Sequence, residues 1–293
     1  MPELSHQPDI PARLFDRRCC LPILAACCIA VVLAGGGCIR DGSTASPSSE
    51  GGMAADSTEA AAEKAKRPVV FIIQVRIATI EVPVGTVSGS EELWSYLDES
   101  RMGIARTAGL GRNGLRVGVG KQGSWADVAG ILTRLTGRSL QSNTATMFDG
   151  TPTSLVVRQD MPEQTIFLTN NDRTLSGSDF PPGNNVMTLT CTINADNPSE
   201  VMVTGLPQIV SRDQHAEIVR ENNRPVWRMV ATTYSFNSAM FRVMIPSEDF
   251  IVIGPGSESR RPHSVGNHFL IHQKKGVDFE TVLILFPEVV ATR

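Results

Sequence analysis

The chain has 293 residues, a formal net charge of −3 at pH 7 and 41% hydrophobic residues, which is enough for one large folded domain or two small ones. Basic and acidic residues are nearly balanced and mixed along the chain, so the charge pattern argues against a nucleic-acid partner, which would need a concentrated basic face. Aromatic residues make up only 5% of the chain, which also argues against a stacking platform for single strands.

The first 37 residues have the three parts of a secretory signal. Three arginines within 13–18 give a positive flank, an apolar run covers 19–34, and three glycines precede Cys38. This order is typical of a removable signal peptide over 1–37. An uncleaved anchor helix is the alternative, but the apolar run is about 16 residues long where a spanning helix needs about 20.

Cys38 is the residue at which the sequence predicts attachment to a membrane. Its position after small residues resembles the lipobox of bacterial lipoproteins, in which the thiol is acylated and the cut falls just before the cysteine. The usual leucine three residues earlier is replaced by Gly35, and Leu33 stands two residues too early. We expect lipidation at Cys38; the alternative is ordinary cleavage near 34–36 and a soluble secreted product.

Residues 38–67 are expected to form the lipid anchor and a flexible tether. The stretch after Cys38 is small, polar and poor in aromatic residues, so it cannot bury a core. The folded part therefore begins near residue 68.

Residues 68–137 are expected to form a small α/β subdomain. β-branched residues and apolar side chains at helical spacing predict its elements. These are a strand over 69–82, a helix opened by Ser90, a loop over 109–114, a strand over 115–120, and a helix from Ser124 to Gly137. The first helix carries Leu93, Trp94, Leu97, Met102 and Ile104, and a break near Gly103 is the alternative to one continuous helix.

After Gly137 the pattern changes to short strands separated by turns. The expected strands cover 140–148, 153–158, 165–168, 185–194, 201–203, 226–236, 240–245, 250–253, 269–271 and 281–290. Many short strands without intervening helices indicate an antiparallel sheet or barrel. The predicted fold class is therefore α+β, with a mainly antiparallel β-sheet part over 138–293 preceded by the small helix-containing subdomain.

The last strand is apolar on both faces. Val282, Ile284 and Phe286 share one face, and Leu283 and Leu285 share the other, because side chains alternate along a strand. Such a strand is either fully buried or has one face against lipid. Pro287 is expected to end its pairing because proline has no N–H donor.

Two glycine patterns, at 109–114 and 118–123, fit the spacing of a dinucleotide-binding loop. Such a fold also needs repeated βα units, which the chain lacks. Tight turns explain these glycines better, so we expect no cofactor-binding residue.

Histidines 263, 268 and 272 cluster near the C-terminus, and in a strand the last two would share a face. Asp278 is the one nearby acidic residue that could join them as a ligand, and a metal site needs three or four convergent ligands, so we expect surface histidines rather than a metal site. Cys191 is expected to be packed, and the carboxylates at 91–92 and 98–99 to be solvated. We therefore predict no catalytic, cofactor or metal residue, and no enzyme activity.

The order of elements from about residue 125 onward resembles the C-terminal core of bacterial secretins, the outer-membrane rings of secretion and pilus machines. The segments that carry the resemblance are the turn at 149–150 with the strand after it, the strand pair 186–194 and 201–203, the hairpin 241–254, the stretch 262–269 with Pro262, Gly266 and Phe269, and the closing strand 279–290. In two respects the chain departs from the family: Gly254-Pro255 replaces the usual Gly-Gly, and only 68–137 could stand for the several N-terminal domains.

The resemblance implies a secretin-like outer-membrane lipoprotein, a candidate subunit or reduced relative of a protein-secretion ring. Its implied partners are membrane lipid through the N-terminal anchor, further copies of the chain in a ring, and secretion-machinery proteins. Its implied location is exported, in the outer membrane or periplasm. The alternative is a monomeric lipid-tethered periplasmic binding or scaffold domain without pore activity.

Overall fold

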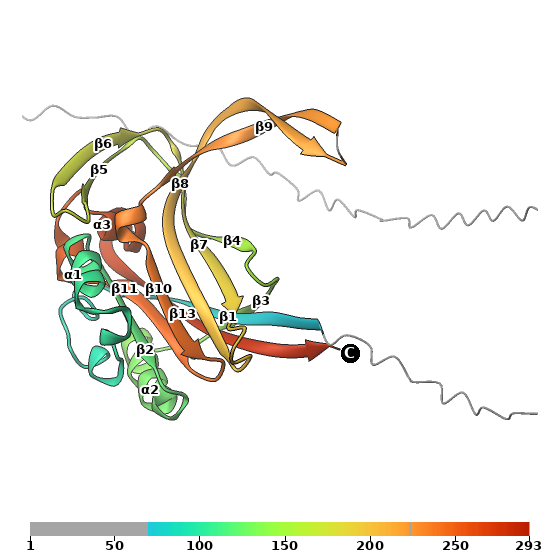
Figure 1. Ribbon diagram of the computed structural model, residues 1–293. Helices are drawn as coiled ribbons and strands as arrows, with labels where there is room; N and C mark the ends of the chain where they lie inside the picture. Colours follow the sequence, from blue (N-terminus) through green and yellow to red (C-terminus); the bar gives the residue numbers. More distant parts are fainter. Residues whose placement is uncertain (1–69, 223, 293) are drawn as a thin grey trace, which may run out of the picture. The chain divides into compact units, whose positions relative to one another are not determined.

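The computed structural model describes residues 70–222 and 224–292 (Figure 1). The signal segment expected over 1–37 and the tether expected over 38–67, with Cys38, lie outside these residues. The described part consists mostly of antiparallel strands with a few short helices, so the α+β expectation is confirmed. None of its helices has the length and apolarity needed to cross a bilayer.

The first sheet is built around the two ends of the folded part. Its strand order is β2 (Leu115–Gly120), β11 (Phe250–Pro255), β13 (Val277–Thr292), β1 (Val70–Pro83) and β3 (Ser142–Met147), and β12 (Ile271–Lys274) also pairs with β13. β1 pairs with β13 along its whole length. The sheet therefore crosses the boundary expected at residue 137, because strands pair with partners that are distant in the sequence.

The second sheet lies against one face of the first (Figure 1). Its order is β10 (Phe241–Pro246), β8 (Glu200–Glu221), β7 (Gly183–Ile193) and β4 (Pro152–Met161), with β9 (Arg224–Ser235) paired to the far half of β8. β5 (Gln164–Thr169) and β6 (Leu175–Phe180) form a separate ribbon. Apolar side chains from both sheets fill the main core between them.

The opposite face of the first sheet is covered by α2 (Trp125–Thr136) and by the segment that follows β1. This second core includes Val128, Leu132 and Trp94. Gly137 ends α2 with φ 65°, as the sequence predicts.

β13 is buried on both faces, which confirms the expected alternation. Leu283 and Leu285 lie in the core between the sheets, and Val282 and Ile284 lie in the core beneath α2. Both faces are covered by the chain itself, so the burial of β13 requires no contact with lipid.

The expectation that Pro287 ends the pairing of β13 is wrong. The strand continues to Thr292, and Pro287 lies opposite Val75 of β1. β11 pairs with β13 only at 283–285, so beyond that point β13 has one neighbour, and a missing N–H costs at most one hydrogen bond.

The helix expected from Ser90 is also wrong, although the break considered near Gly103 is present. The segment contains two 3-10 turns, Trp94–Tyr96 and Ser100–Met102, and α1 (Ile104–Arg112) begins only after Gly103. Between the turns Asp98 forms a β-bridge with Val119, with its N–H 2.8 Å from the Val119 carbonyl oxygen. That pairing requires extended backbone, and Gly103 at φ 81° reorients the chain.

Three smaller expectations also differ from the structure. The loop expected at 109–114 is mostly the second half of α1. The strand expected at 269–271 is mostly α3 (Val265–Leu270), whose first turn is capped by Ser264, since its Oγ accepts from Asn267 N at 3.1 Å. A short apolar run cannot distinguish helix from strand. β6 was not expected because its sequence contains few apolar residues.

Glu280 connects β13 to the loop that follows β1. Its carboxylate is fully buried and accepts from Gly85 N at 2.7 Å, Val87 N at 2.9 Å and Ser88 N at 3.1 Å, and also from the Ser88 hydroxyl. A buried carboxylate needs such donors, so Glu280 fixes the loop that carries the chain over the second core.

Candidate interaction surface

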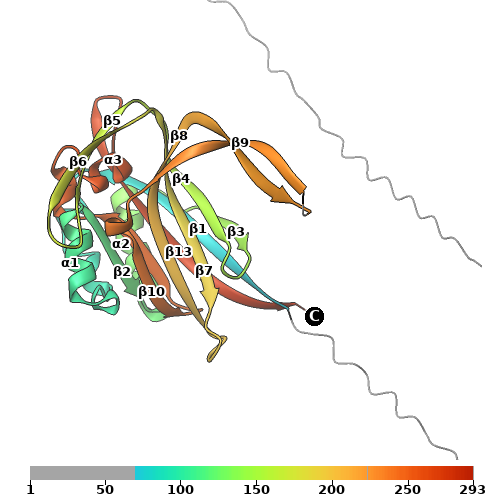
Figure 2. The same ribbon diagram turned by 45° about the horizontal axis from the view of Figure 1, so that its top comes forward.

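A β-hairpin formed by β8 and β9 extends away from the two sheets (Figure 1), and the rotated view shows the same separation (Figure 2). β7 pairs with β8 only as far as Ser211. From Gln214 to Glu221, β8 pairs with β9 alone, after a register shift between Val210 and Gln214. The outer hairpin thus has two strands and two open edges.

One face of this outer hairpin is apolar. Ala216 lies opposite Met229, and Ile218 lies opposite Trp227, so all four side chains share a face. Ile218 is 55% exposed, Met229 62% and Trp227 69%. We call these four residues the apolar hairpin face.

The other face of the outer hairpin carries acidic residues of β8 opposite basic residues of β9. Glu217 lies opposite Arg228 and Glu221 opposite Arg224, and the Arg228 guanidinium pairs with the Glu221 carboxylate. The valines Val219 and Val226 lie between these pairs. We call this side the charged hairpin face, and it makes the hairpin amphipathic.

Hydrogen bonds and aromatic contacts join the base of the hairpin to the rest of the fold. Gln208 Nε2 donates to Ser235 Oγ at 2.7 Å, and Phe236 N donates to the Pro207 carbonyl at 3.0 Å. The Phe236 ring packs edge-on against Phe180 and Phe269 at centroid distances of 5.2 and 5.8 Å. The apolar hairpin face is therefore held at a defined place beside the sheets.

An isolated two-stranded hairpin is only marginally stable in water. Grouped exposed apolar side chains mark interaction sites more often than single ones do, and Trp is enriched in the centres of interfaces. The apolar hairpin face is therefore the strongest candidate for a contact surface among the described residues.

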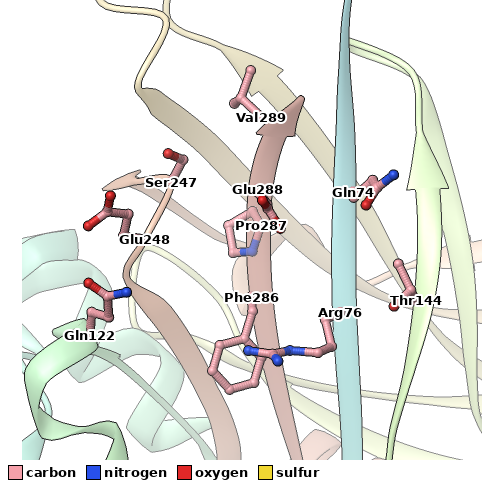
Figure 3. A pocket seen from close by; sticks show the side chains of 10 residues that line it. All are labelled: Gln74, Arg76, Gln122, Thr144, Ser247, Glu248, Phe286, Pro287, Glu288 and Val289. Carbon is pink, nitrogen blue, oxygen red and sulfur yellow. The ribbon is translucent and has the colours of Figure 1, made fainter. Parts of the chain in front are cut away.

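A polar cavity of about 540 Å³ lies where β13 extends beyond β11 (Figure 3). The Arg76 guanidinium stacks on the Phe286 ring there, 4.3 Å from its centroid, and Glu248 and Glu288 add opposite charge. Pro287 and Glu288 lie on the open part of β13 and disfavour the addition of another strand there. This cavity therefore offers a weaker contact surface than the hairpin does.

The three C-terminal histidines lie on different elements of the fold, with His268 on α3 and His272 on β12. No group of three or more potential metal ligands occurs within 70–222 and 224–292. His263 is exposed as expected, but His268 and His272 are half-buried, and the two do not share a strand because His268 lies on α3. Burial lowers the pKa of His268, and the His272 ring nitrogen Nε2 lies 3.1 Å from Glu81 Oε1.

Cys191 is buried in β7, with its Sγ 3.8 Å from Met147 Sδ. Burial raises the pKa of its thiol to about 12, so the thiolate needed for reactivity does not form near neutral pH. The expectation of a packed cysteine is confirmed.

The expectation of solvated carboxylates is wrong for Glu99. Its Oε1 lies 2.6 Å from Arg116 Nη2, and Glu91 Oε2 lies 2.7 Å from the same nitrogen. The Arg116 guanidinium is 4.6 Å from the Trp94 ring centroid. This cluster joins β2 to the segment that covers the second core, so these carboxylates have a structural role.

The second glycine pattern also has a packing explanation. Gly118 and Gly120 lie within β2, and a Cβ atom added at Gly120 would lie 2.1 Å from Phe250 Cζ. Glycine at this position lets the Phe250 ring pack directly against the backbone of β2.

No family model and no curated protein matches the chain. Solved structures that resemble it include the Klebsiella pneumoniae type II secretion system outer membrane complex of PulD, PulS and the PulC HR domain, at 11% identity over 78% of this chain and 41% of that one, with a TM-score of 0.22. Aeromonas hydrophila ExeD is 13% identical over 77% of this chain and 48% of that one, with a TM-score of 0.18.

The InvG secretin domain β-barrel from the Salmonella SPI-1 injectisome is 8% identical over 77% of this chain and 62% of that one, with a TM-score of 0.15. The similarity to secretins is weak. TM-scores this low do not establish a shared fold, and the chain spans less than half of the first two structures.

Proposed function

We propose that this chain is a secretin-like, lipid-anchored protein of the outer membrane or periplasm, and that it is a subunit, or a reduced relative of a subunit, of a multi-copy assembly. The observation that carries the proposal is the apolar hairpin face, which no other described segment covers. The order of sequence elements from residue 125 onward supports the secretin-like part. The lipid anchor rests on Cys38 alone.

The hairpin is suited to contact between copies for two reasons. Its apolar face is exposed, and its strand edges are unpaired. Past Ser211, β8 has no neighbour on the side opposite β9 among the described strands. An open edge is a template for a further strand. Hairpins of successive copies that pair edge to edge would close into a wall and bring their apolar faces to one side of it.

The contribution of the apolar hairpin face to such a contact can be estimated. Full burial of an Ile or Met side chain contributes about 1.5 to 3 kcal/mol. Since Ile218 and Met229 are each more than half exposed, we expect about 1 kcal/mol from each and more from Trp227. Because association itself costs at least several kcal/mol, these side chains would add to an assembly whose main contacts are the paired strand edges.

The second candidate is a monomeric lipid-tethered scaffold whose hairpin binds a different protein. The charged hairpin face favours it, because the ion pair between Glu221 and Arg228 on opposite strands supports the hairpin without a neighbouring copy. In this reading the apolar hairpin face is still a contact surface.

Substitutions on the two hairpin faces test the proposal. The full chain extracted in a mild detergent is compared with Ile218→Ser/Trp227→Ser and with a control on the charged hairpin face, Glu217→Ser. We expect a large oligomer for the wild type and the control, and dissociation for the double variant with unchanged thermal unfolding of the body. Oligomers of equal size and stability in all three proteins would refute the role of the apolar hairpin face.

A further inference from the structure

Two β-bulges determine the position of Arg158. The pairing of β4 with β7 shifts register between Val156 and Arg158, and again between Arg158 and Met161. Asp160, within the second shift, has φ 53°. Bulges redirect side chains and are over-represented next to functional sites.

The Arg158 side chain reaches the chain segment after α3, where Nη1 donates to the Ile271 carbonyl. Arginine has five N–H donors in a rigid fork, so this bond leaves further donors for a ligand. Two β-bulges and a carbonyl contact thus hold a guanidinium in place without using its whole donor set.

Arg158 has no carboxylate partner within the described ranges. It is half-buried, and burial lowers the pKa of its guanidinium with no acidic group opposing that effect. The other half-buried arginine discussed above, Arg116, is held by two carboxylates. A partly desolvated cation without a counter-ion is unfavourable, so an anion that reaches Arg158 would be stabilised.

A cavity of about 340 Å³ lies beside this guanidinium. Its lining includes Arg158, Asn267, His268, His272, Gln273 and Asp278. The Asp278 carboxylate is exposed and accepts from Gln273 Nε2 at 3.2 Å, and His272 pairs with Glu81. Both acidic groups therefore have partners other than Arg158.

The buried Nε2 atom of His268 has no hydrogen-bond partner among the described residues. A buried polar atom without a partner usually indicates a missing water, ion or ligand. Because this atom has almost no accessible surface, it does not face the open cavity, and the observation that points to an occupant there is the guanidinium of Arg158 with its unused donors.

We propose that this cavity is an oxyanion-binding site in which the guanidinium fork of Arg158 binds the phosphate or carboxylate group of a small molecule. Arginine matches both groups because its parallel N–H donors can bind two oxygens at once. The volume is at the lower end of that of ligand pockets, which favours a small anion. The inference is independent of the assembly proposed above.

The test measures thermal unfolding of the full chain in inorganic phosphate, in acetate and in chloride at equal ionic strength, followed by calorimetric titration of the probe that stabilises the protein. We expect a saturable rise in Tm with phosphate or acetate relative to chloride. A response to phosphate identifies the phosphate class, and a response to acetate alone identifies the carboxylate class. No rise with either anion would overturn the proposal.

Substitutions at Arg158 show whether the anion binds at this residue. Arg158→Gln should weaken binding at least tenfold, and Arg158→Lys, which keeps the charge but not the fork, should lie between it and the wild type. Arg242→Gln, at an exposed position on β10, is the matched control and should bind like the wild type. If Arg158→Gln fails to fold, the lysine variant carries the comparison. Wild-type affinity in Arg158→Lys and in any folded Arg158→Gln would also overturn the proposal.

Discussion

The two-sided burial of β13 can be tested at two neighbouring residues. Ile284 is 0% exposed beneath α2, and Leu285 is 1% exposed between the two sheets. Replacing either side chain by aspartate places a carboxylate in a different apolar core. Both substitutions should therefore damage the protein severely, although they point in opposite directions.

The loss in free energy of unfolding can be estimated from the interactions that each side chain loses. Truncation of a buried Ile or Leu to alanine costs about 2 to 5 kcal/mol, because apolar burial is lost and a cavity remains. Aspartate adds the cost of burying an unpaired polar or charged group, about 2 kcal/mol or more. The total approaches the whole stability of an average domain, about 5 to 15 kcal/mol. Val277→Asp is the control in the same strand, because Val277 is 51% exposed.

The assay is urea unfolding of the three variants and the wild type, with soluble expression as a second measure. Ile284→Asp and Leu285→Asp should be largely unfolded without denaturant, whereas Val277→Asp should unfold within about 0.5 kcal/mol of the wild type. Stability close to that of the wild type in either core variant would refute burial on both faces.

Three further predictions concern single side chains. Cys38→Ser should leave the precursor uncut, which mass spectrometry of the N-terminus detects; unchanged processing would exclude lipidation at this residue. Because burial lowers the folded-state pKa of His268, its contribution to stability is present above the unfolded pKa of about 6.5 and is lost as pH falls through the folded pKa. His268→Gln should therefore flatten the acid side of a stability–pH curve, and the same slope in wild type and variant would contradict this. Glu280→Ala should cost about 3 kcal/mol or more, because it leaves buried donors at Val87 and Ser88 unpaired; a loss below about 1 kcal/mol in urea unfolding would contradict the role of this carboxylate.

The fold class could be predicted from the sequence because its main signals are local. The alternation from Val282 to Phe286 predicts burial on both faces, and Gly137 marks the end of α2. Such signals depend only on the period of apolar residues and on the backbone freedom of glycine.

The errors come from contacts between residues that are distant in the sequence. Leu93, Trp94 and Leu97 have helical spacing, but the bridge between Asp98 and Val119 holds the chain extended beside them. The spacing of apolar residues fits both arrangements, so only the tertiary pairing distinguishes them.

For the same reason, the sequence predicts neither the candidate surface nor the Arg158 cavity. The sequence predicts a strand over 201–203 only. In the structure β8 continues to Glu221 through polar residues that pair only with β9. The alternation of Ala216 and Ile218 with charged residues is a weak signal for this extension. The bulges around Arg158 depend on the register with β7, and no local pattern encodes them.

The most direct test of the proposed assembly is the mass of the wild-type full chain extracted from its membrane in a mild detergent, measured by analytical ultracentrifugation with the detergent contribution subtracted. Assembly through the hairpin predicts a single species containing many copies that persists on dilution. A species with the mass of one chain at all concentrations would contradict the assembly and leave the lipid-tethered scaffold as the function of this protein.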